Sequence, residues 1–389
     1  MLHQSLQHTH NQHKKNLGQF FTTNNSYILQ GLEEFVTNKN VVDPFAGNQD
    51  LLNWARQNNC NSCYGFDLDK NLVNNTSVFF NDSINNPKDY QFVCTNPPYL
   101  NKNKASKAIK EQFFAKQDFV DLYQVAINAI LSCQEGILIV PLNFLSASNS
   151  AKIRQIFFQK FAIKKLNIFN QQVFADTSYN VIAFYFCKLS PTQKQQTIEA
   201  TIYPQKQQLE IVLKQQDGWQ FGGDIFEKIA NVKNGLAISR ITKKHLEKGD
   251  LSIKIATQDF KNTEIIKVSD KCKQILEQNI ILLNAIDTKN GRKICLQDIR
   301  NTEILALIGK ESSRNLAHLI FDQPIEINQQ LKLINLFNQH LTAYRTKYHS
   351  FFLTNFRDNN RKRISFEFVY KFINFLYYEY IENQFNISH

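Results

Sequence analysis

The chain has 389 residues, and a composition of 43% hydrophobic and 20% charged residues indicates a globular protein and excludes a wholly disordered one. Its 45 Lys and Arg outnumber its 34 Asp and Glu, and the formal net charge of +11 favours a polyanionic partner, although many soluble proteins are equally basic. The 7 cysteines are scattered along the chain, which excludes a dense disulfide scaffold and favours reduced thiols.

The sequence gives no sign of export, membrane insertion or metal binding. The first residues, MLHQSLQHTHNQHKKN, lack the apolar run of a signal peptide, and no stretch of about 18 apolar residues could span a bilayer. Cys60 and Cys63 form a CxxC pair, but the second pair that a four-ligand zinc site requires is missing. We therefore expect a cytoplasmic protein that holds no metal.

Short apolar runs alternate with helix-like segments through the first half of the chain. Such alternation is typical of a parallel sheet with crossover helices, so we expect a doubly wound α/β domain. Residues 118–131 carry apolar side chains at helical spacing, which predicts a helix with one face in the core. The predicted strands are residues 40–45, 62–68, 76–82, 91–98, 136–142, 163–169, 181–187 and 198–203.

The composition changes near the end of this series. Gln- and Lys-rich segments occupy residues 191–196 and 204–219, and we place a domain boundary near residue 215. The chain is therefore expected to form a first domain of residues 1–215 and a second domain of residues 216–389. We expect the second domain to be mostly helical.

The tetrapeptide Asn96-Pro97-Pro98-Tyr99 directly follows a predicted strand, so it projects from the carboxyl end of the sheet, where open α/β folds bind ligands. An Asn oxygen and a prolyl carbonyl can accept both hydrogens of a weakly nucleophilic amine such as adenine N6, which directs the nitrogen lone pair towards an electrophile. Tyr99 offers an aromatic face, and stacking a base on such a face is worth about 1–3 kcal/mol. The alternative is two prolines that merely end a strand, and the position of the tetrapeptide makes it the weaker one.

With this motif the chain resembles the gamma-type N6-adenine-specific DNA methyltransferases of type II restriction-modification systems, over much of residues 14–190. The resemblance implies a Rossmann-like domain that binds S-adenosylmethionine, followed by a DNA target-recognition domain. It implies a bacterial or phage enzyme that acts on an adenine flipped out of duplex DNA. The catalytic residues that it implies are Asn96, Pro97, Tyr99 and Phe174, with Phe174 as the second aromatic neighbour of the base.

The same resemblance implies a set of cofactor contacts. The segment KNLGQFFT at residues 15–22 is similar to the family's N-terminal motif, VVDPFAGNQDLL at 41–52 to its first cofactor loop, and GFDLDK at 65–70 to its second. Asp67 follows Gly47 by 20 residues, the spacing expected when two successive strands deliver a loop and an acid to one crevice. The implied contacts are Phe20, Thr22, Asp43, Gly47, Asp67, Asp82 and Asn96.

Two positions depart from the family pattern. Gln49 stands where the family often has a further Gly, and Ser83 replaces a frequent apolar neighbour of the cofactor adenine. Cys94 lies inside a predicted strand without the Pro-Cys motif of cytosine C5 methyltransferases, so we interpret it as a packing residue.

Several segments of the second half carry cations that could reach DNA. NVKNGLAISRITKKHL at residues 231–246 resembles segments that open recognition domains, IGKESSRN at 308–315 is polar enough for a groove-reading loop, and residues 344–363 mix cations with aromatics. A solvated face over a helical core explains the last segment nearly as well. The predicted DNA contacts are Arg240, Lys243, Lys244, Arg345, Lys347, Arg361 and Arg363.

Two other function classes stay open at this stage. The same tetrapeptide serves RNA adenine and protein glutamine methyltransferases, and a DNA-binding protein on a decayed methyltransferase fold would need no activity. The expected partners are double-stranded DNA and a restriction endonuclease that acts as a separate protein. We expect the methyltransferase itself to be a monomer.

Overall fold

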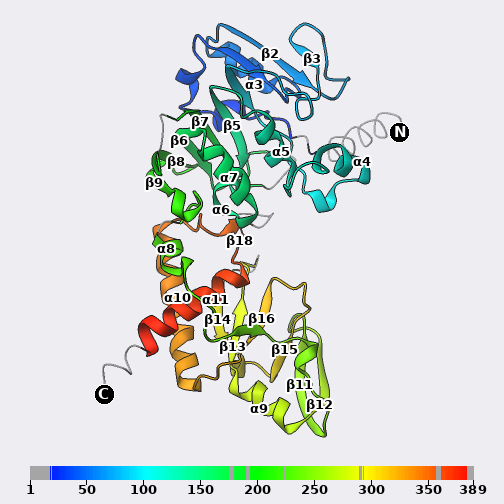
Figure 1. The fold of residues 1–389 in the computed structure, drawn as a ribbon, viewed down its shortest axis with the longest axis vertical. Helices are drawn as coiled ribbons and strands as arrows, with labels where there is room; N and C mark the ends of the chain where they lie inside the picture. Colours follow the sequence, from blue (N-terminus) through cyan, green and yellow to red (C-terminus); the bar gives the residue numbers. More distant parts are fainter. Residues whose placement is uncertain are drawn as a thin grey trace. The chain divides into compact units, whose positions relative to one another are not determined.

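The computed structural model describes residues 18, 20–174, 179–189, 193–222, 224–288, 291, 293–355 and 361–382. The chain forms two compact units that divide after Gly223. Each unit has its own sheets and helices (Figure 1). The predicted boundary at residue 215 falls directly after the last strand of the first unit, which ends at Lys214. The end of the sheet is set by this strand and not by the Gln-rich composition of its flanks.

Nine strands of the described residues form one mixed sheet in the first unit, in the order β3-β2-β1-β4-β5-β7-β6-β8-β9. The strands from β3 to β5 are parallel, β7 is antiparallel to both of its neighbours, and β8 runs parallel to β6. The doubly wound α/β prediction is confirmed. The strands are β1 Asn40–Asp43, β2 Ser62–Asp67, β3 Val78–Phe80, β4 Phe92–Thr95, β5 Glu135–Pro141, β6 Phe161–Phe169, β7 Val181–Lys188, β8 Gln195–Tyr203 and β9 Gln207–Lys214.

The last strand of this sheet was not predicted. Residues 207–214 form β9, which pairs antiparallel with β8 from Gln195↔Lys214 to Ile202↔Gln207. The sequence of β9 did not indicate a strand because most of its residues are polar. Only alternate side chains such as Ile211 and Leu213 point into the core.

The helices of the first unit are short. Predicted helix 118–131 forms as α5, Leu122–Ala129, and it begins later than predicted because Asp121 and Gln124 form a capping box at its start. Helix α3 packs on β1, β2 and β4. The described helices are α2 Asn25–Ile28, η1 Glu33–Phe35, α3 Asp50–Gln57, η2 Lys102–Lys104, α4 Lys107–Ile109, η3 Lys110–Phe114, α5 Leu122–Ala129, α6 Asn143–Ser146, η4 Ser148–Ser150, α7 Ala151–Phe158 and η5 Gln215–Asp217.

The strand order reverses between β1 and β4. From β1 the chain moves outward to β2 and β3 on one side, and later returns to β4 and β5 on the other. The carboxyl ends of β1 and β4 therefore lie side by side, paired through Val41↔Phe92 and Val42↔Val93. A reversal of this kind opens a crevice outside the strand ends, which is where doubly wound sheets bind their ligands.

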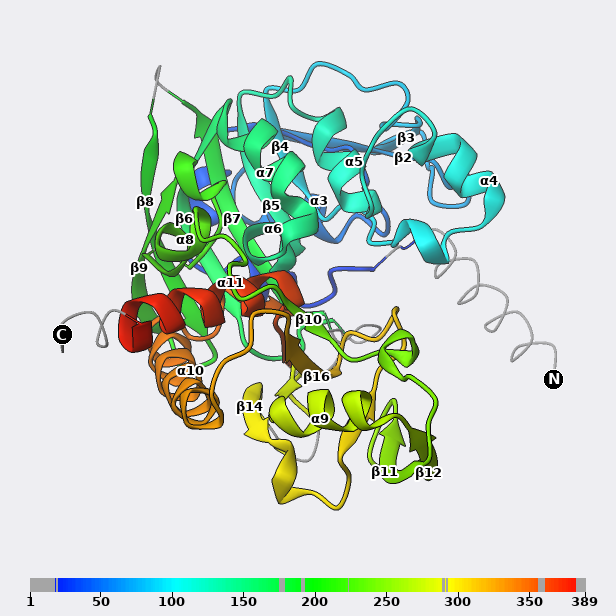
Figure 2. The same ribbon diagram turned by 60° about the horizontal axis from the view of Figure 1, so that its bottom comes forward.

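The prediction of a mostly helical second unit needs correction. Figures 1 and 2 show long helices, but the unit also contains a four-stranded sheet, β10-β16-β13-β14, and a three-stranded sheet, β12-β11-β15, among its described residues. The strands escaped notice because they are short and carry Lys, Gln and Asn on their exposed faces. Those strands are β10 Ile238–Arg240, β11 Leu251–Thr257, β12 Thr263–Val268, β13 Ile281–Asn284, β14 Cys295–Asp298, β15 Ala306–Ile308, β16 Leu316–Phe321, β17 Thr354–Asn355 and β18 Lys362–Arg363.

Two long helices complete the core of the second unit. Helix α10, Ile327–Lys347, packs on β14 and on α11, Phe366–Tyr377 (Figure 2). The rings of Phe337 and Phe372 meet across this helix pair with their centroids 5.3 Å apart. The remaining helices are α8 Asp224–Ala230, η6 Lys243–His245, α9 Asp270–Gln278, η7 Ile299–Asn301 and η8 Tyr378–Glu382.

A buried arginine ties α7 to the chain that follows β9. The guanidinium of Arg154, 1% exposed, donates hydrogen bonds to the carbonyls of Phe144, Ala147 and Gly218 at 3.0, 2.6 and 3.2 Å. The Nη2 atom of Arg154 donates to Gln220 Oε1 at 3.3 Å. Burial lowers the pKa of Arg154 to about 10, so the cation is kept in the core by these oxygens.

Replacing Arg154 by Met should lower the free energy of unfolding by about 3 kcal/mol, because the carbonyls that it serves lose their donor inside the core. Chemical denaturation followed by circular dichroism measures this change. Lys152→Met is the matched control on the same helix, since the side chain of Lys152 is 51% exposed and its ion pair with Asp118 is worth little. Equal stability of the two variants would contradict the assignment.

Candidate active site

A cavity lies at the carboxyl ends of β1, β2 and β4, at the point where the strand order reverses. Its empty space is about 650 Å³, part of which is open solvent at the mouth. The cavity is lined by Phe20, Phe21, Pro44, Phe45, Gly47, Asp67, Leu68, Asn81, Asp82, Ser83, Ile84, Asn96, Pro98, Phe113 and Leu122.

Five of the seven predicted cofactor contacts line this cavity, and two do not. Phe20, Gly47, Asp67, Asp82 and Asn96 are lining residues, whereas Thr22 and Asp43 are 3% and 1% exposed and lie behind the wall. Of the segment at residues 15–22, Lys15, Asn16, Leu17 and Gln19 lie outside the described residues.

Asp43 supports the site from inside the sheet. Its Oδ1 accepts hydrogen bonds from the Thr95 hydroxyl at 2.5 Å and from the Phe45 amide at 3.0 Å. Burial raises the pKa of Asp43 to about 7, and the nearby carboxylates of Asp67 and Asp50 add to the rise. Asp43 thus joins the ends of β1 and β4, directly before the residues that face the cavity.

Asp67, at the end of β2, holds Gly47 in the turn between β1 and α3. The Gly47 amide donates to Asp67 Oδ2 at 2.9 Å, and the Asp69 amide donates to Oδ1 at 2.7 Å. Gly47 has φ +51°, and a Cβ at this position would lie 3.2 Å from the Phe21 ring. Burial raises the pKa of Asp67, which presents a largely desolvated carboxyl group to the cavity.

The opposite part of the cavity is more apolar and was partly missed from the sequence. Asp82 lies at this wall, where its Oδ1 accepts from the amides of Ile84 and Asn85 at 3.2 and 3.1 Å. Ile84, Phe113 and Leu122 provide flat or branched apolar surface beside it. Ile84 directly follows Ser83 and places an apolar side chain on the cavity wall, whereas no motif around Phe113 indicates that this residue lines the cavity.

The side-chain amide of Asn96 is fixed in one orientation. Its Nδ2 donates to the Phe20 carbonyl at 2.9 Å and to the Thr22 hydroxyl at 3.1 Å. Its Oδ1 accepts from the Tyr99 hydroxyl at 2.5 Å. Thr22 therefore helps to position Asn96 and does not itself line the cavity.

Tyr99 is held by more contacts than its predicted stacking role requires. Its hydroxyl is 2.9 Å from the Ile139 carbonyl in β5, and its backbone amide donates to the Gly18 carbonyl at 2.8 Å. Burial raises the pKa of Tyr99 well above its ordinary value, so its hydroxyl keeps its proton and acts as a donor.

The two aromatic residues predicted to hold a base are packed against each other. Tyr99 and Phe174 are 5% and 2% exposed, and their rings meet edge to face with centroids 6.5 Å apart and planes inclined by 69°. A base stacked between two rings needs parallel faces separated by two van der Waals contacts of about 3.5 Å each. The structure therefore brings the two rings together but leaves no slot between them.

The cations predicted to contact DNA have different surroundings within the second unit. Lys243 and Lys347 are exposed, and Lys244 is exposed in an ion pair with Glu311 at 2.5 Å. The Arg240 guanidinium instead donates to the backbone carbonyls of Glu311 and Ser313. Arg361 and Arg363 are half-buried, and neither lacks a partner.

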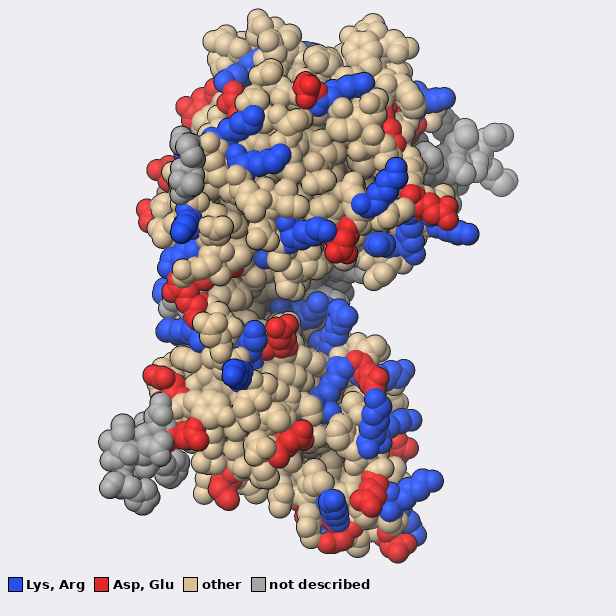
Figure 3. All heavy atoms as spheres, viewed as in Figure 1, with Lys and Arg blue, Asp and Glu red and all other residues tan. Residues whose placement is uncertain are grey.

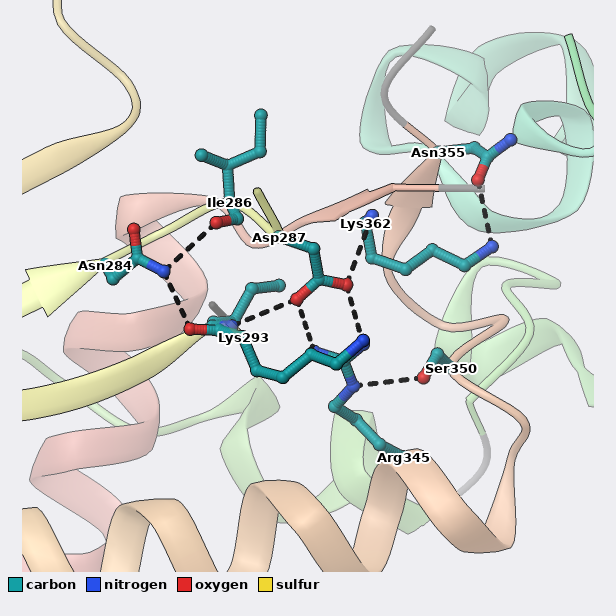
Figure 4. Close-up of polar contacts among 9 residues, drawn as sticks. Asn284, Ile286, Asp287, Lys293, Arg345, Ser350, Asn355 and Lys362 are labelled. Carbon is teal, nitrogen blue, oxygen red and sulfur yellow. Dashed lines mark hydrogen bonds and ion pairs between the residues drawn. The ribbon is translucent and has the colours of Figure 1, made fainter. Parts of the chain in front are cut away.

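Arg345, a predicted phosphate contact, forms an ion pair within the second unit. Its guanidinium donates to both oxygens of Asp287 at 2.9 and 2.7 Å and to the Ser350 hydroxyl at 3.0 Å (Figure 4). Next to it, the buried Lys362 donates from Nζ to Asn355 Oδ1 at 2.9 Å, and burial lowers the pKa of Lys362 to about 7. This cluster joins α10 to the β17–β18 pair.

Other site classes find no support in the described residues. Within the described ranges, no three His, Cys, Asp or Glu side chains are arranged to hold a metal ion. The helices described here are all too short or too polar to cross a lipid bilayer.

Residues 9–174 match the family model described as Eco57I restriction-modification methylase, and no curated protein matches the chain. A solved structure with similarity is the type IIL restriction-modification enzyme MmeI in complex with DNA, at 10% identity, 90% of this chain, 64% of that chain and a TM-score of 0.47. Another is the type IIG restriction endonuclease BpuSI, at 11% identity, 86% of this chain, 55% of that chain and a TM-score of 0.43.

A third is a modification subunit assigned to a type I restriction enzyme from Vibrio vulnificus YJ016, at 14% identity, 69% of this chain, 62% of that chain and a TM-score of 0.40. The chain spans less than two thirds of the length of each of these three proteins. The family match lies within the first unit.

Replacing Asp43 by Asn should flatten the pH dependence of stability between about pH 4 and pH 7. The carboxyl of Asp43 binds its proton more tightly in the folded chain than in the unfolded chain, so its contribution is complete below pH 3.8 and is lost as pH rises through about 7. Urea denaturation at several pH values measures the difference between variant and wild type. Parallel stability profiles of the two proteins would contradict the raised pKa.

Proposed function

We propose that this chain is a site-specific DNA methyltransferase that transfers the methyl group of S-adenosylmethionine to N6 of an adenine in duplex DNA. The observation that carries the proposal is the fixed amide of Asn96 at the edge of the cavity that holds most of the predicted cofactor contacts. The match of residues 9–174 to a restriction-modification methylase family supports the methyl transfer.

The lining of the cavity fits the three parts of S-adenosylmethionine. Asp67 offers a carboxyl group to the ribose hydroxyls, and Asp82 with Ile84 and Phe113 offers an acceptor and apolar surface to the adenine ring. Phe20 lies near Asn96, where the methionine part with its sulfonium would be held. When bound, the cofactor supplies an activated methyl group, and the protein supplies alignment and dipoles.

Asn96 and Pro97 would bind the acceptor amine. The Asn96 Oδ1 and the Pro97 carbonyl are hydrogen-bond acceptors for the two hydrogens of N6, and this binding localises the nitrogen lone pair. Methyl transfer forms an N–C bond while the S–C bond breaks with its electron pair on sulfur, and N6 then releases one proton. Thr22 and the Phe20 carbonyl keep Nδ2 turned away, so the oxygen faces the side of Tyr99.

Entry of a base requires Tyr99 and Phe174 to separate. Both rings are buried and packed edge to face while no base is present. A flipped adenine would replace this contact by stacking, which is worth about 1–3 kcal/mol and offsets part of the few kcal/mol spent in unpairing the base. We propose that these two rings, once apart, hold the base.

The second unit would select the DNA site. Its exposed cations favour nucleic acid over a protein glutamine as the substrate. We further propose that the enzyme acts as a cytoplasmic monomer and that any restriction endonuclease is a separate protein.

Replacing Asn96 by Ala should lower methylation of duplex DNA at least about 100-fold, because one acceptor of the amine is lost at the point where charge develops. Transfer of labelled methyl groups to DNA, followed by nucleoside analysis, measures the effect. Calorimetry should show S-adenosylmethionine bound within tenfold of the wild-type affinity. Asn103→Ala, at an exposed position after the same strand, is the control that should keep full activity.

The proposal fails if wild-type protein places the label on RNA or protein and not on DNA adenine. It also fails if Asn96→Ala keeps wild-type activity.

Tyr99→Phe and Tyr99→Ala should separate the two roles of Tyr99. The Phe variant loses the hydroxyl bond to Asn96 and should lose about fivefold in kcat, since a hydrogen bond contributes about 1 kcal/mol. The Ala variant also loses the stacking face and should fall about a further tenfold or more. Steady-state kinetics on duplex DNA gives both values, and a Phe variant as inactive as the Ala variant would refute the division.

A further inference from the structure

The loop between β15 and β16 is exposed, polar and held in place by an arginine. Residues 309–315 connect Ile308 to Leu316, and Lys310, Glu311, Ser312 and Arg314 are exposed along it. The Gly309 amide donates to the Ile241 carbonyl at 3.2 Å, and the Asn315 carbonyl accepts from the Ala285 amide at 2.7 Å. Both ends of the loop are therefore tied to neighbouring segments.

Arg240 fixes the middle of the loop. One guanidinium nitrogen donates to the Glu311 carbonyl and the other to the Ser313 carbonyl, while the guanidinium carbon lies 5.2 Å from the centroid of the Phe366 ring. The fork of two parallel donors suits a guanidinium and cannot be formed by a lysine. Water could satisfy the carbonyls of an exposed loop equally well. The hydrogen bonds from Arg240 therefore indicate that the loop is held in one conformation for binding.

The clamped loop presents cations without acidic partners. Among the described residues, the side chains of Lys243, Lys310 and Arg314 have no hydrogen bond or ion pair, and Lys244 has the only carboxylate that the loop offers, Glu311. Burial, and secondly the nearby charge of Arg314, lower the pKa of Arg363. Like charges gathered in this way are unfavourable until an anion lies between them.

Figure 3 shows Lys and Arg side chains gathered along one side of the second unit. A row of cations on a preorganised loop fits a regularly spaced polyanion. Because the loop is already ordered, less conformational entropy is lost on binding. Aromatic side chains that would stack unpaired bases are absent from residues 309–315. The surface therefore favours the backbone of a duplex over a single strand.

We propose that loop 309–315 binds the phosphate backbone of duplex DNA through Lys310 and Arg314, and that Arg240 is the positioning residue that gives the loop its shape. The proposal rests on the proposed function for the choice of DNA as the polyanion. It also changes the predicted role of Arg240 from a DNA contact to a positioning residue, because its guanidinium donates to backbone carbonyls of its own chain.

The double variant Lys310→Ala/Arg314→Ala tests the phosphate contacts. Fluorescence anisotropy with a 20-base-pair duplex of arbitrary sequence, between 50 and 200 mM KCl, should show the slope of log K against log salt reduced by about 1.8, or 0.9 for each lost phosphate contact. The control Lys267→Ala/Lys271→Ala removes the same charge from exposed positions in β12 and α9 and should keep the wild-type slope.

Arg240→Lys tests the positioning role, because it keeps the charge and removes the fork. The KM for long unmethylated duplex DNA should rise at least tenfold with kcat unchanged, while the salt slope stays within about 0.5 of wild type, less than the 0.9 expected for one lost phosphate contact. A residue that merely stabilises the fold would lower the active fraction, and so the apparent kcat, and would leave KM unchanged. Thermal denaturation of the variant confirms that it is folded under assay conditions.

Wild-type KM in Arg240→Lys with a raised KM in Arg240→Ala would overturn the positioning role, because charge alone would then suffice. Equal slopes in the Lys310/Arg314 variant and its control would overturn the loop assignment while leaving methyl transfer intact. Absence of duplex binding by the wild-type protein, or preference for RNA, would overturn both proposals. S-adenosylmethionine binding, measured separately, is unaffected by any change in this loop.

Discussion

The hydrogen bonds around the Asn96 amide are the constraint on which the proposed chemistry depends. A primary amide can present either its oxygen or its nitrogen, and only the oxygen can accept an N6 hydrogen. Nδ2 is held by the Phe20 carbonyl and Thr22, and Oδ1 is held by the Tyr99 hydroxyl, so the amide cannot turn over. The segment before β1 thus sets the orientation of a side chain that lies 74 to 76 residues further along the chain.

The sheet holds this arrangement at the edge of a ligand cavity. Because β1 and β4 are neighbours at the reversal of strand order, the buried carboxyl of Asp43 can bond to Thr95, the residue before Asn96. On the other side of the turn, Asp67 receives the Gly47 amide. One set of strand ends therefore carries both the predicted cofactor contacts and the residue proposed to bind the amine. The second unit contributes a separate surface, where Arg240 organises a loop and Arg345 closes a buried ion pair.

The sequence was enough to predict the eight strands of the first unit through β8 and the helix α5, because buried strands are apolar and their spacing is regular. It also located the cavity through Gly47, Asp67, Asp82 and Asn96. It could not tell a residue that lines the cavity from one behind the wall, such as Thr22 or Asp43. Short strands with polar exposed faces, such as β11, and cations turned inward, such as Arg345, carry no signal in composition, because their partners lie far along the chain.

The central claim is that adenine N6 in duplex DNA is the acceptor. Single-molecule sequencing of DNA from a methyltransferase-deficient host that expresses the chain tests it most directly, because position, base and modified atom class are observed together. The account predicts N6-methyladenine confined to one short recurring sequence. Unmodified adenine throughout the genome, or a modification found on cytosine, would contradict it.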